Sequence, residues 1–251
     1  MDSRLKLLDF NTLALSLSDL LMPRVCLCCG RALLPDEEHL CYVCMADLPL
    51  TFFEGMVHNP MADKLNALVE GASSYCRAVA LFYYKEHSYG RITQALKYGR
   101  NFAAGRFFAR MMAERLAGSE FWRDIDVVCP VPLHFSRQFK RGYNQAAVIA
   151  EVIADRIGAR FEPRLLRRVR HTGTQTQLSG EERMKNVRGA FAIREGVLTD
   201  SIGQGKVLKI MIIDDVFTTG SSLASCHNAI KQRYGSAVEI CIATLAYTDG
   251  K

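Results

Sequence analysis

The sequence lacks any apolar run of the length that a membrane-spanning helix needs, about 20 residues. Its apolar N-terminal stretch, from Asp9 to Leu21, is interrupted by Asp9 and Asp19 and is followed by no small-residue cleavage site, which argues against a signal peptide. Helical spacing of the leucines in this region predicts instead an amphipathic helix over residues 1–22 that packs on the rest of the protein. These leucines are Leu5, Leu8, Leu13, Leu17, Leu20 and Leu21. We therefore expect a cytoplasmic protein with no transmembrane segment.

A strongly one-sided charge is also absent. The chain has 32 Lys and Arg against 26 Asp and Glu, and 49% of its 251 residues are apolar, which is a globular composition. This length gives room for one core domain of ordinary size and a small additional module. The modest basic excess is concentrated between Lys97 and Arg170, which favours a partner that carries phosphates.

The most informative segment begins at Val207 and is typical of a strand, a loop and a helix in succession. Its largely aliphatic run, residues 207–213, predicts a strand buried on both faces, and such strands belong to parallel sheets. The run ends in Asp214 and Asp215, and a loop of hydroxyl side chains and glycine leads into the helix. Ligands of open α/β sheets bind beyond the carboxyl ends of the strands, and a helix N-terminus favours phosphate. Because two acids suit a diol, a divalent metal or both, the segment predicts a sugar-phosphate site.

Three other interpretations of this segment are possible. A receiver domain also has a hydrophobic strand that ends in two acids, but it needs far more sequence after them than follows Asp215. The segment also resembles the second nucleotide motif of P-loop ATPases, but the required G-x-x-x-x-G-K-[ST] loop is missing. The third interpretation is a simple strand–turn–helix junction whose acids face solvent, and the hydroxyl-rich loop argues against it.

Nine cysteines are unusual in a cytoplasmic chain and indicate metal binding or redox chemistry rather than disulfides. Two C-x-x-C pairs can place four thiolates tetrahedrally around one Zn²⁺, as in zinc ribbons. With four thiolate ligands no coordination position is left for catalysis, so the metal is expected to be structural. Gly30 fits the turn after the first pair, and Cys28 is an extra thiol that could compete with Cys29. The predicted ligands are Cys26, Cys29, Cys41 and Cys44.

A redox-active C-x-x-C pair is the alternative explanation for this cluster. Such a motif normally begins a helix in a thioredoxin-like βαβ context, which is missing here, so structural zinc is favoured. The other four cysteines are scattered in apolar contexts and are expected to be ordinary buried residues. They are Cys76, Cys129, Cys226 and Cys241.

The middle of the chain alternates predicted strands and helices, which favours a parallel α/β domain. The strands are residues 78–84 and 125–134, the second breaking into a proline-containing loop, and the helices are residues 87–98, 102–116 and 144–157. A polar, Thr/Gln-rich segment flanked by basic residues follows, from Arg167 to Val187. We interpret it as a mobile loop of the kind that closes over a substrate and excludes water.

The segment Asp214-Asp215-Val-Phe-Thr-Thr-Gly-Ser-Ser resembles the phosphoribosyl-pyrophosphate (PRPP) signature of type I phosphoribosyltransferases. The resemblance implies that Asp214 and Asp215 hold the ribose 2′ and 3′ hydroxyls. It also implies that the hydroxyl loop binds the 5-phosphate and that Mg²⁺ accompanies PRPP. The loop residues are Thr218, Thr219, Gly220, Ser221 and Ser222; the last is more often Thr in the family.

In the same family the loop after the strand of residues 125–134 holds the pyrophosphate. The resemblance assigns this role to Val131, Pro132, Leu133 and His134, with Arg137, Lys140 and Arg141 as added cations. Taken singly, these cations also fit a solvated basic turn before a helix. Lys97 is a further candidate to stabilise the departing pyrophosphate, and it joins Asp214 and Asp215 as a candidate catalytic residue.

The four-cysteine module, Ala-Leu-Lys-Tyr at residues 95–98, Arg-Gly-Tyr-Asn-Gln at 141–145, the Thr/Gln loop and the PRPP motif follow one another in the order of the ComF family. The resemblance covers nearly the whole chain and implies a zinc module at residues 23–52 and a phosphoribosyltransferase-like domain at 73–251. Members of the family are associated with natural competence and the use of DNA. A phosphoribosyltransferase with an unidentified acceptor is the first hypothesis. The alternative is a single-stranded DNA-binding competence protein that stacks bases on Tyr98, Phe102, Phe139 and Tyr143 and keeps the pocket for ligand binding.

Overall fold

The computed structural model describes residues 24–70, 74–98, 101–133, 142–169, 189–198 and 206–249. The chain divides into two compact units, with the boundary between Leu48 and Pro49. The amphipathic helix predicted over residues 1–22 lies outside the described residues, as does most of the Thr/Gln-rich segment. Among the described residues, no helix is long and apolar enough to cross a membrane.

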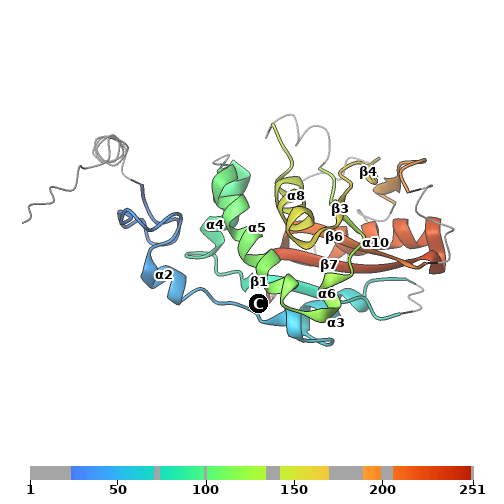
Figure 1. The fold of residues 1–251 in the computed structure, drawn as a ribbon, viewed down its shortest axis with the longest axis horizontal. Helices are drawn as coiled ribbons and strands as arrows, with labels where there is room; N and C mark the ends of the chain where they lie inside the picture. The colour runs from blue at the N-terminus through green and yellow to red at the C-terminus, as the bar shows by residue number, and fades with distance from the viewer. Residues whose placement is uncertain are drawn as a thin grey trace, which may run out of the picture. The chain divides into compact units, whose positions relative to one another are not determined.

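The larger unit is built on a five-stranded parallel sheet (Figure 1). In spatial order its strands are β1 (Ala78–Tyr83), β7 (Val238–Tyr247), β6 (Leu208–Phe217), β2 (Val127–Pro130) and β3 (Arg160–Phe161). The sheet is buried on both faces, as the nearly continuous burial of β1, β2 and β7 shows. This explains why these strands are apolar without alternation. The predicted fold class, a parallel sheet flanked by helices with a small four-cysteine module before it, is confirmed.

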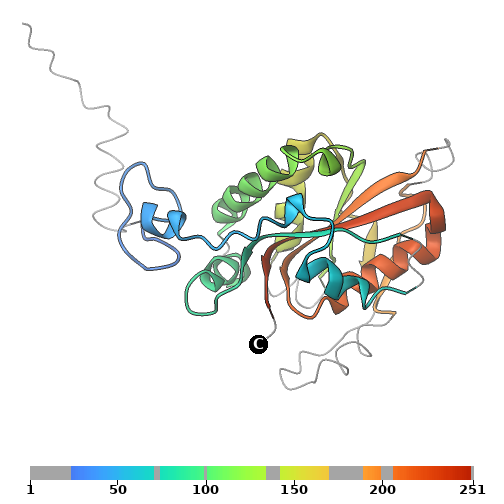
Figure 2. The ribbon, with the colours of Figure 1, turned by 90° about the horizontal axis from the view of Figure 1, so that it is seen from below.

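Helices cover both faces of the sheet (Figures 1 and 2). On one face lie α5 (Phe102–Ala117) and α8 (Gln145–Ile157), which pack on each other, and α4 (Gly90–Tyr98) packs against α5. On the other face lie α3 (Pro60–Asn66) and α10 (Ser221–Tyr234), with η2 (Gly235–Ala237) leading from α10 into β7. The helices predicted at residues 87–98, 102–116 and 144–157 and after the hydroxyl loop are present, although α4 begins three residues later than expected because residues 86–89 form a turn.

Shorter elements complete the larger unit. Leu50 forms an antiparallel bridge with Phe82 of β1, the strand at one edge of the sheet. The segment before η1 (Phe53–Gly55) therefore covers part of this edge. The helix α6 (Glu120–Arg123) precedes β2. A separate antiparallel pair joins β4 (Leu166–Arg168) to β5 (Phe191–Ile193). Because β4 contains Arg167 and Arg168, the prediction that the Thr/Gln loop begins at Arg167 is wrong; backbone pairing with β5 holds these two residues in a strand.

The order of the strands creates a switch point between β2 and β6, which are hydrogen-bonded neighbours. From β2 the chain passes through α8 to β3 on one side, and from β6 it passes through α10 to β7 on the other side. The loops that leave these two strands therefore diverge at the carboxyl edge of the sheet. In open α/β sheets this divergence marks the crevice in which ligands bind.

Candidate functional site

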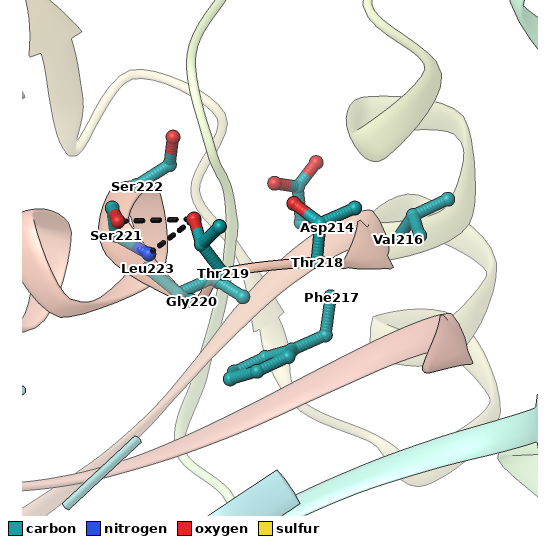
Figure 3. A pocket seen from close by; sticks show the side chains of 9 residues that line it. All are labelled: Asp214, Val216, Phe217, Thr218, Thr219, Gly220, Ser221, Ser222 and Leu223. Carbon is teal, nitrogen blue, oxygen red and sulfur yellow. Dashed lines mark hydrogen bonds between the residues drawn. The ribbon is translucent and has the colours of Figure 1, made fainter. Parts of the chain in front are cut away.

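The junction between β6 and α10 forms a small open pocket (Figure 3). It encloses about 240 Å³, part of which is open solvent, and is lined by Asp214, by residues 216–222 and by Leu223. All five residues predicted to bind a 5-phosphate, Thr218 to Ser222, belong to this lining. The pocket lies directly after β6, at the switch point of the sheet.

The loop of this pocket is shaped by Gly220, which caps the N-terminus of α10 in a left-handed conformation with φ of +77°. Its Cα faces the buried ring of Phe217, which lies beneath the loop in Figure 3. The hydroxyls of Thr219 and Ser221 lie 3.0 Å apart, and the amide of Ser221 donates to the Thr219 hydroxyl at 3.5 Å. Hydroxyl donors therefore gather at the positive end of a fourteen-residue helix, an arrangement that favours a bound phosphate.

The two acids at the end of β6 have different surroundings, because consecutive side chains of a strand point to opposite faces of the sheet. Asp214 lines the pocket, and its Oδ1 accepts the backbone N–H of Asp215 at 2.9 Å. The Asp215 carboxylate instead forms an ion pair with Lys97 of α4, with 3.1 Å between Oδ2 and Nζ, and both side chains are largely buried. The structure thus brings together the three residues that the sequence analysis named as catalytic candidates.

Burial and the neighbouring charge of Asp215 raise the pKa of Asp214 to about 7, although Lys97 and Arg168 act in the opposite direction. Near neutral pH the Asp214 carboxyl group is therefore partly protonated. Carboxylate oxygens at such a site can bind a divalent cation such as Mg²⁺ or accept hydrogen bonds from a ligand.

Replacing Asp214 by Asn is expected to stabilise the ligand-free protein at high pH. A carboxyl group whose pKa is higher in the folded than in the unfolded chain stabilises the fold only while it is protonated. This contribution is complete below its unfolded pKa of 3.8 and is lost as the pH rises through about 7. We expect the variant to gain on the order of 4 kcal/mol in unfolding free energy near pH 8 and very little near pH 4. Urea unfolding at the two pH values measures this, and an equal difference at both would contradict the raised pKa.

The loop after β2 begins next to the two acids. The amide of Val131 donates to the carbonyl of Ile213, at 2.8 Å, immediately before Asp214. The side chain of Asn144, which caps α8, donates to the carbonyl of Val131 at 3.0 Å. Val131, Pro132 and Leu133, three of the predicted pyrophosphate-binding residues, therefore follow the switch point, and Val131 is hydrogen-bonded to the residue before Asp214. The other four, His134, Arg137, Lys140 and Arg141, lie outside the described residues.

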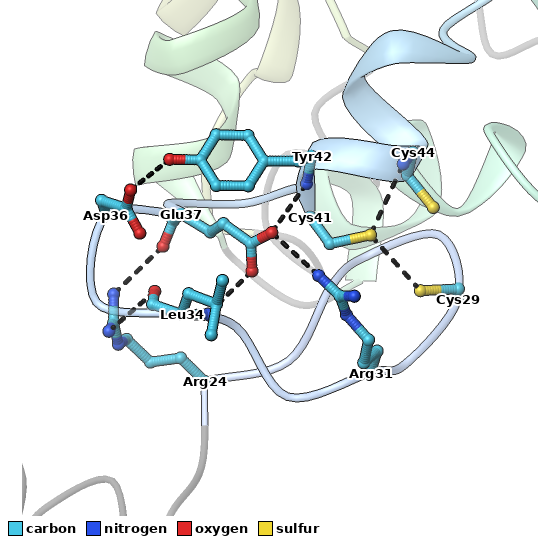
Figure 4. Close-up of polar contacts among 9 residues, drawn as sticks. All are labelled: Arg24, Cys29, Arg31, Leu34, Asp36, Glu37, Cys41, Tyr42 and Cys44. Carbon is cyan, nitrogen blue, oxygen red and sulfur yellow. Dashed lines mark hydrogen bonds and ion pairs between the residues drawn. The ribbon is translucent and has the colours of Figure 1, made fainter.

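The smaller unit contains the four predicted metal ligands, three of which, Cys29, Cys41 and Cys44, are drawn in Figure 4. The Sγ atoms of Cys26, Cys29, Cys41 and Cys44 all lie within 4.8 Å of one another. Those of Cys29 and Cys41 are 3.8 Å apart, which matches the separation of about 3.8 Å between ligands at 2.3 Å from a tetrahedral zinc. The four cysteines are therefore close enough to hold one zinc ion. Cys28 is buried but is not part of this cluster.

Local structure explains how the cluster forms. The amide of Gly30 donates to the carbonyl of Cys26 at 2.9 Å, and Gly30 has a φ of +74°, so the chain turns back directly after the first pair. The second pair opens the short helix α2 (Tyr42–Ala46). There the Cys41 sulfur caps the helix by accepting the amide of Cys44 at 3.4 Å. The first pair is thus shaped by a backbone hydrogen bond, and the second by a bond from a backbone amide to a cysteine sulfur.

Glu37 is an important residue of this unit that the sequence analysis did not identify. Its buried carboxylate accepts the amides of Leu34 and Tyr42, both at 2.7 Å, and pairs with Arg31 at 2.9 Å (Figure 4). The Leu34 amide, then the Tyr42 amide and the Arg31 charge, lower the pKa of Glu37 against the opposing effect of burial. The carboxylate thus joins the irregular segment after the first cysteine pair to the start of α2. An acid in a polar turn carries no sequence signal for this role, because most glutamates are exposed.

The remaining cysteines are buried in the larger unit, as predicted. Cys76, Cys129, Cys226 and Cys241 are each at most 3% exposed. Burial raises the pKa of the Cys76 thiol to about 12 and raises the pKa values of Cys129, Cys226 and Cys241 as well. Neutral thiols without access to solvent are unreactive, which agrees with a packing role.

The chain is similar to curated proteins of competence and DNA use. It is 30% identical over 135 residues to competence protein F of Haemophilus influenzae, an alignment that covers 53% of this chain and 57% of that protein. It is 32% identical over 130 residues to the DNA utilization protein YhgH of Salmonella typhimurium, covering 52% of each. The chain thus spans little more than half the length of the curated relatives it matches.

Two further comparisons are less informative. No protein-family model matches the chain. Among solved structures it is similar to the adenine phosphoribosyltransferase of Leishmania tarentolae, with a TM-score of 0.31 and 16% identity, over 63% of this chain and 74% of that one. From its sequence relatives, the resemblance to the ComF family is confirmed: over about half of its length the chain is a homologue of competence protein F and DNA utilization protein YhgH.

Proposed function

We propose that the larger unit binds PRPP together with Mg²⁺ and transfers its phosphoribosyl group to an acceptor, in the context of DNA uptake and use. The observation that carries the proposal is the pocket after β6, where Asp214 and the hydroxyl loop of Thr218 to Ser222 line one space. The acids suit the ribose hydroxyls and the loop suits the 5-phosphate. The loop after β2 starts alongside, where a pyrophosphate would extend.

The charges of the site fit this reaction. Departure of pyrophosphate from C1 leaves positive charge on the ribose ring, as in glycoside hydrolysis. Asp214 and Asp215 would offset that charge, while Lys97 would neutralise the leaving group. When bound, Mg²⁺ would supply further neutralisation of the phosphates. Arg137, Lys140 and Arg141 remain proposed partners of the pyrophosphate on sequence grounds.

The zinc module is proposed to be structural. Four thiolates fill the coordination sphere of Zn²⁺, so the smaller unit, of which the structure describes residues 24–48, would fold around the metal and take no part in the transfer. The larger unit, which begins at Pro49, would then form the phosphoribosyltransferase domain. This division assigns the two cation requirements, zinc and magnesium, to different parts of the chain.

Calorimetry with PRPP and Mg²⁺ tests the proposed pocket. Each acid replaced by asparagine loses a hydrogen bond from a ribose hydroxyl to a charged group, which contributes about 1.5–3 kcal/mol. We therefore expect the double variant Asp214→Asn/Asp215→Asn to bind PRPP at least about 100-fold more weakly than the wild type. Asp126→Asn, at a different carboxylate of the same unit, is the control and should bind normally. Unchanged affinity in the double variant would reject this assignment of the pocket. If PRPP binding is confirmed, pyrophosphate release measured across a panel of bases and amines would identify the acceptor.

Binding of single-stranded DNA is a second candidate function. It is favoured by the names of the relatives and by the exposed aromatic rings of Tyr98 and Phe102, next to Lys97. Aromatic rings beside cations can stack bases in any sequence. A fluorescent oligonucleotide titrated at two salt concentrations measures this binding, which should weaken as salt rises. If Tyr98→Ala binds as tightly as the wild type, or no salt-dependent shift occurs, this function is rejected for the site.

A further inference from the structure

The hydroxyl of Tyr143 donates a hydrogen bond to the carbonyl of Leu96. Tyr143 stands just before α8, whereas Leu96 is in the last turn of α4, 47 positions earlier in the chain. The next residue after Leu96 is Lys97, the residue that forms the ion pair with Asp215. One side-chain hydrogen bond therefore reaches from the segment before α8 to the backbone that carries Lys97.

This hydrogen bond has a clear physical role at the end of α4. The last four carbonyl groups of a helix have no partner within the helix and need one elsewhere. The carbonyl of Ala95 accepts the amide of Asn101 at 3.4 Å, and that of Leu96 accepts the Tyr143 hydroxyl. Leu96 itself is 2% exposed, so an unsatisfied carbonyl at this position would be unfavourable. Tyr143 thus fixes the direction in which the helix ends.

Two more contacts hold Tyr143 in place. Its ring lies against that of Phe102, at the start of α5, with 4.4 Å between the ring centroids. The neighbouring Asn144 donates to the carbonyl of Val131, in the loop after β2. Tyr143 is therefore anchored both to α5 and, through its neighbour, to the edge of the sheet beside the acids. Because Tyr143 is held in this way, its hydrogen bond to Leu96 fixes the end of α4 relative to α5 and to the edge of the sheet.

We propose that Tyr143 is a positioning residue: its hydroxyl, bonded to the Leu96 carbonyl, fixes the last turn of α4 so that the Lys97 ammonium stays on the Asp215 carboxylate. An effect of Tyr143 on PRPP binding rests on the proposed function above. The position of Lys97 on Asp215 is independent of that function, because it is a property of the ligand-free protein. In a PRPP site, this contact would keep a cation where the pyrophosphate departs, without Tyr143 touching the ligand.

Labelling of Lys97 tests the placement without any ligand. Tyr143→Phe keeps the ring against Phe102 and removes only the hydroxyl. Loss of one hydrogen bond of about 1 kcal/mol should release Lys97 from its ion pair and raise its acetylation rate roughly threefold to fivefold, measured by mass spectrometry against other lysines. Tyr75→Phe is the matched control, since it removes another tyrosine hydroxyl bond, the one to Asp63, and should leave Lys97 labelling unchanged. Equal labelling of Lys97 in wild type and Tyr143→Phe overturns the proposal.

A double-mutant cycle with PRPP and Mg²⁺ then separates positioning from a general effect on folding. Tyr143→Phe should weaken binding by about fivefold when Lys97 is present and have almost no effect in a Lys97→Ala background. The same fivefold loss in both backgrounds would show that Tyr143 acts independently of Lys97 and overturn the role. If the wild type does not bind PRPP, the proposed function fails, whereas the labelling result still decides whether Tyr143 positions Lys97.

Discussion

Replacing Cys41 by serine is expected to abolish stoichiometric zinc binding and to unfold residues 24–48, while the larger unit stays folded. Cys41 is 1% exposed and its sulfur is 3.8 Å from that of Cys29. Serine can still cap α2 with its hydroxyl, so the loss would come from the metal site rather than from the helix cap.

The size of this effect follows from how little else holds the smaller unit together. In the described part of the unit the buried apolar side chains are Cys26, Cys28, Leu40, Cys41 and Leu48. Two of these five are candidate zinc ligands, so the remaining core is too small to support a fold. Structural zinc sites in small modules contribute about 10–16 kcal/mol, which is folding free energy because the site does not exist in the unfolded chain. The Glu37 carboxylate also joins parts of this unit, but its hydrogen bonds to Leu34 and Tyr42 form only when the unit is folded. They therefore cannot replace the metal.

Metal analysis and hydrogen exchange measure this prediction together. Cys41→Ser should contain no zinc and should lose amide protection in residues 24–48, with protection of β6 and β7 retained. Cys28→Ser is the matched control, because it removes a buried thiol from the same turn but not from the cluster of four. Full zinc content in Cys41→Ser, or equal loss in Cys28→Ser, would show that the ligand set is different.

Local sequence was enough to predict the strands and helices that carry strong apolar patterns, and non-local pairing explains the differences. The strand at β6 was expected to end before the acids, but pairing of Asp214, Val216 and Phe217 with β7 extends it to Phe217. β7 itself was not predicted, although its apolar run carries the same signal as β6. The short pair of β4 and β5 has almost no local signal, because each strand is only three residues long.

In the candidate site, too, some features follow from local sequence and others depend on tertiary structure. The residues of the hydroxyl loop are consecutive, so their gathering in one pocket follows from the sequence motif and from the strand-to-helix turn. Lys97 was a candidate because of its charge and its motif, but its ion pair with Asp215 joins residues far apart in the chain. The contact between Tyr143 and Leu96 and the role of Glu37 likewise depend on tertiary structure alone. Sequence therefore identified the groups of the site, and the fold determines which of them meet.

Gly220→Ala is expected to destabilise the larger unit and to remove binding of a phosphorylated ribose. Its φ of +77° is unfavourable for alanine by about 1–2 kcal/mol. A Cβ at this position would lie 2.6 Å from Cζ of Phe217 and 3.1 Å from Cδ1 of Leu68. Phe217 is fully buried, so its ring has no space into which it can move. This overlap adds about 1–3 kcal/mol, for a total loss of about 2–5 kcal/mol in unfolding free energy.

The matched control is Gly158→Ala, at the end of α8. Gly158 is also left-handed, with a φ of +73°, but no atom lies within 4 Å of an added Cβ. Urea unfolding should therefore show only the conformational part of the loss, about 1–2 kcal/mol, for this variant. Because relief of the overlap must shift the loop between Phe217 and Ser221, binding of ribose 5-phosphate should weaken more than about 100-fold in Gly220→Ala and remain normal in Gly158→Ala. Equal stability of the two variants would mean that the loop can move away from Phe217 without strain, and wild-type affinity in Gly220→Ala would place the phosphate outside this pocket.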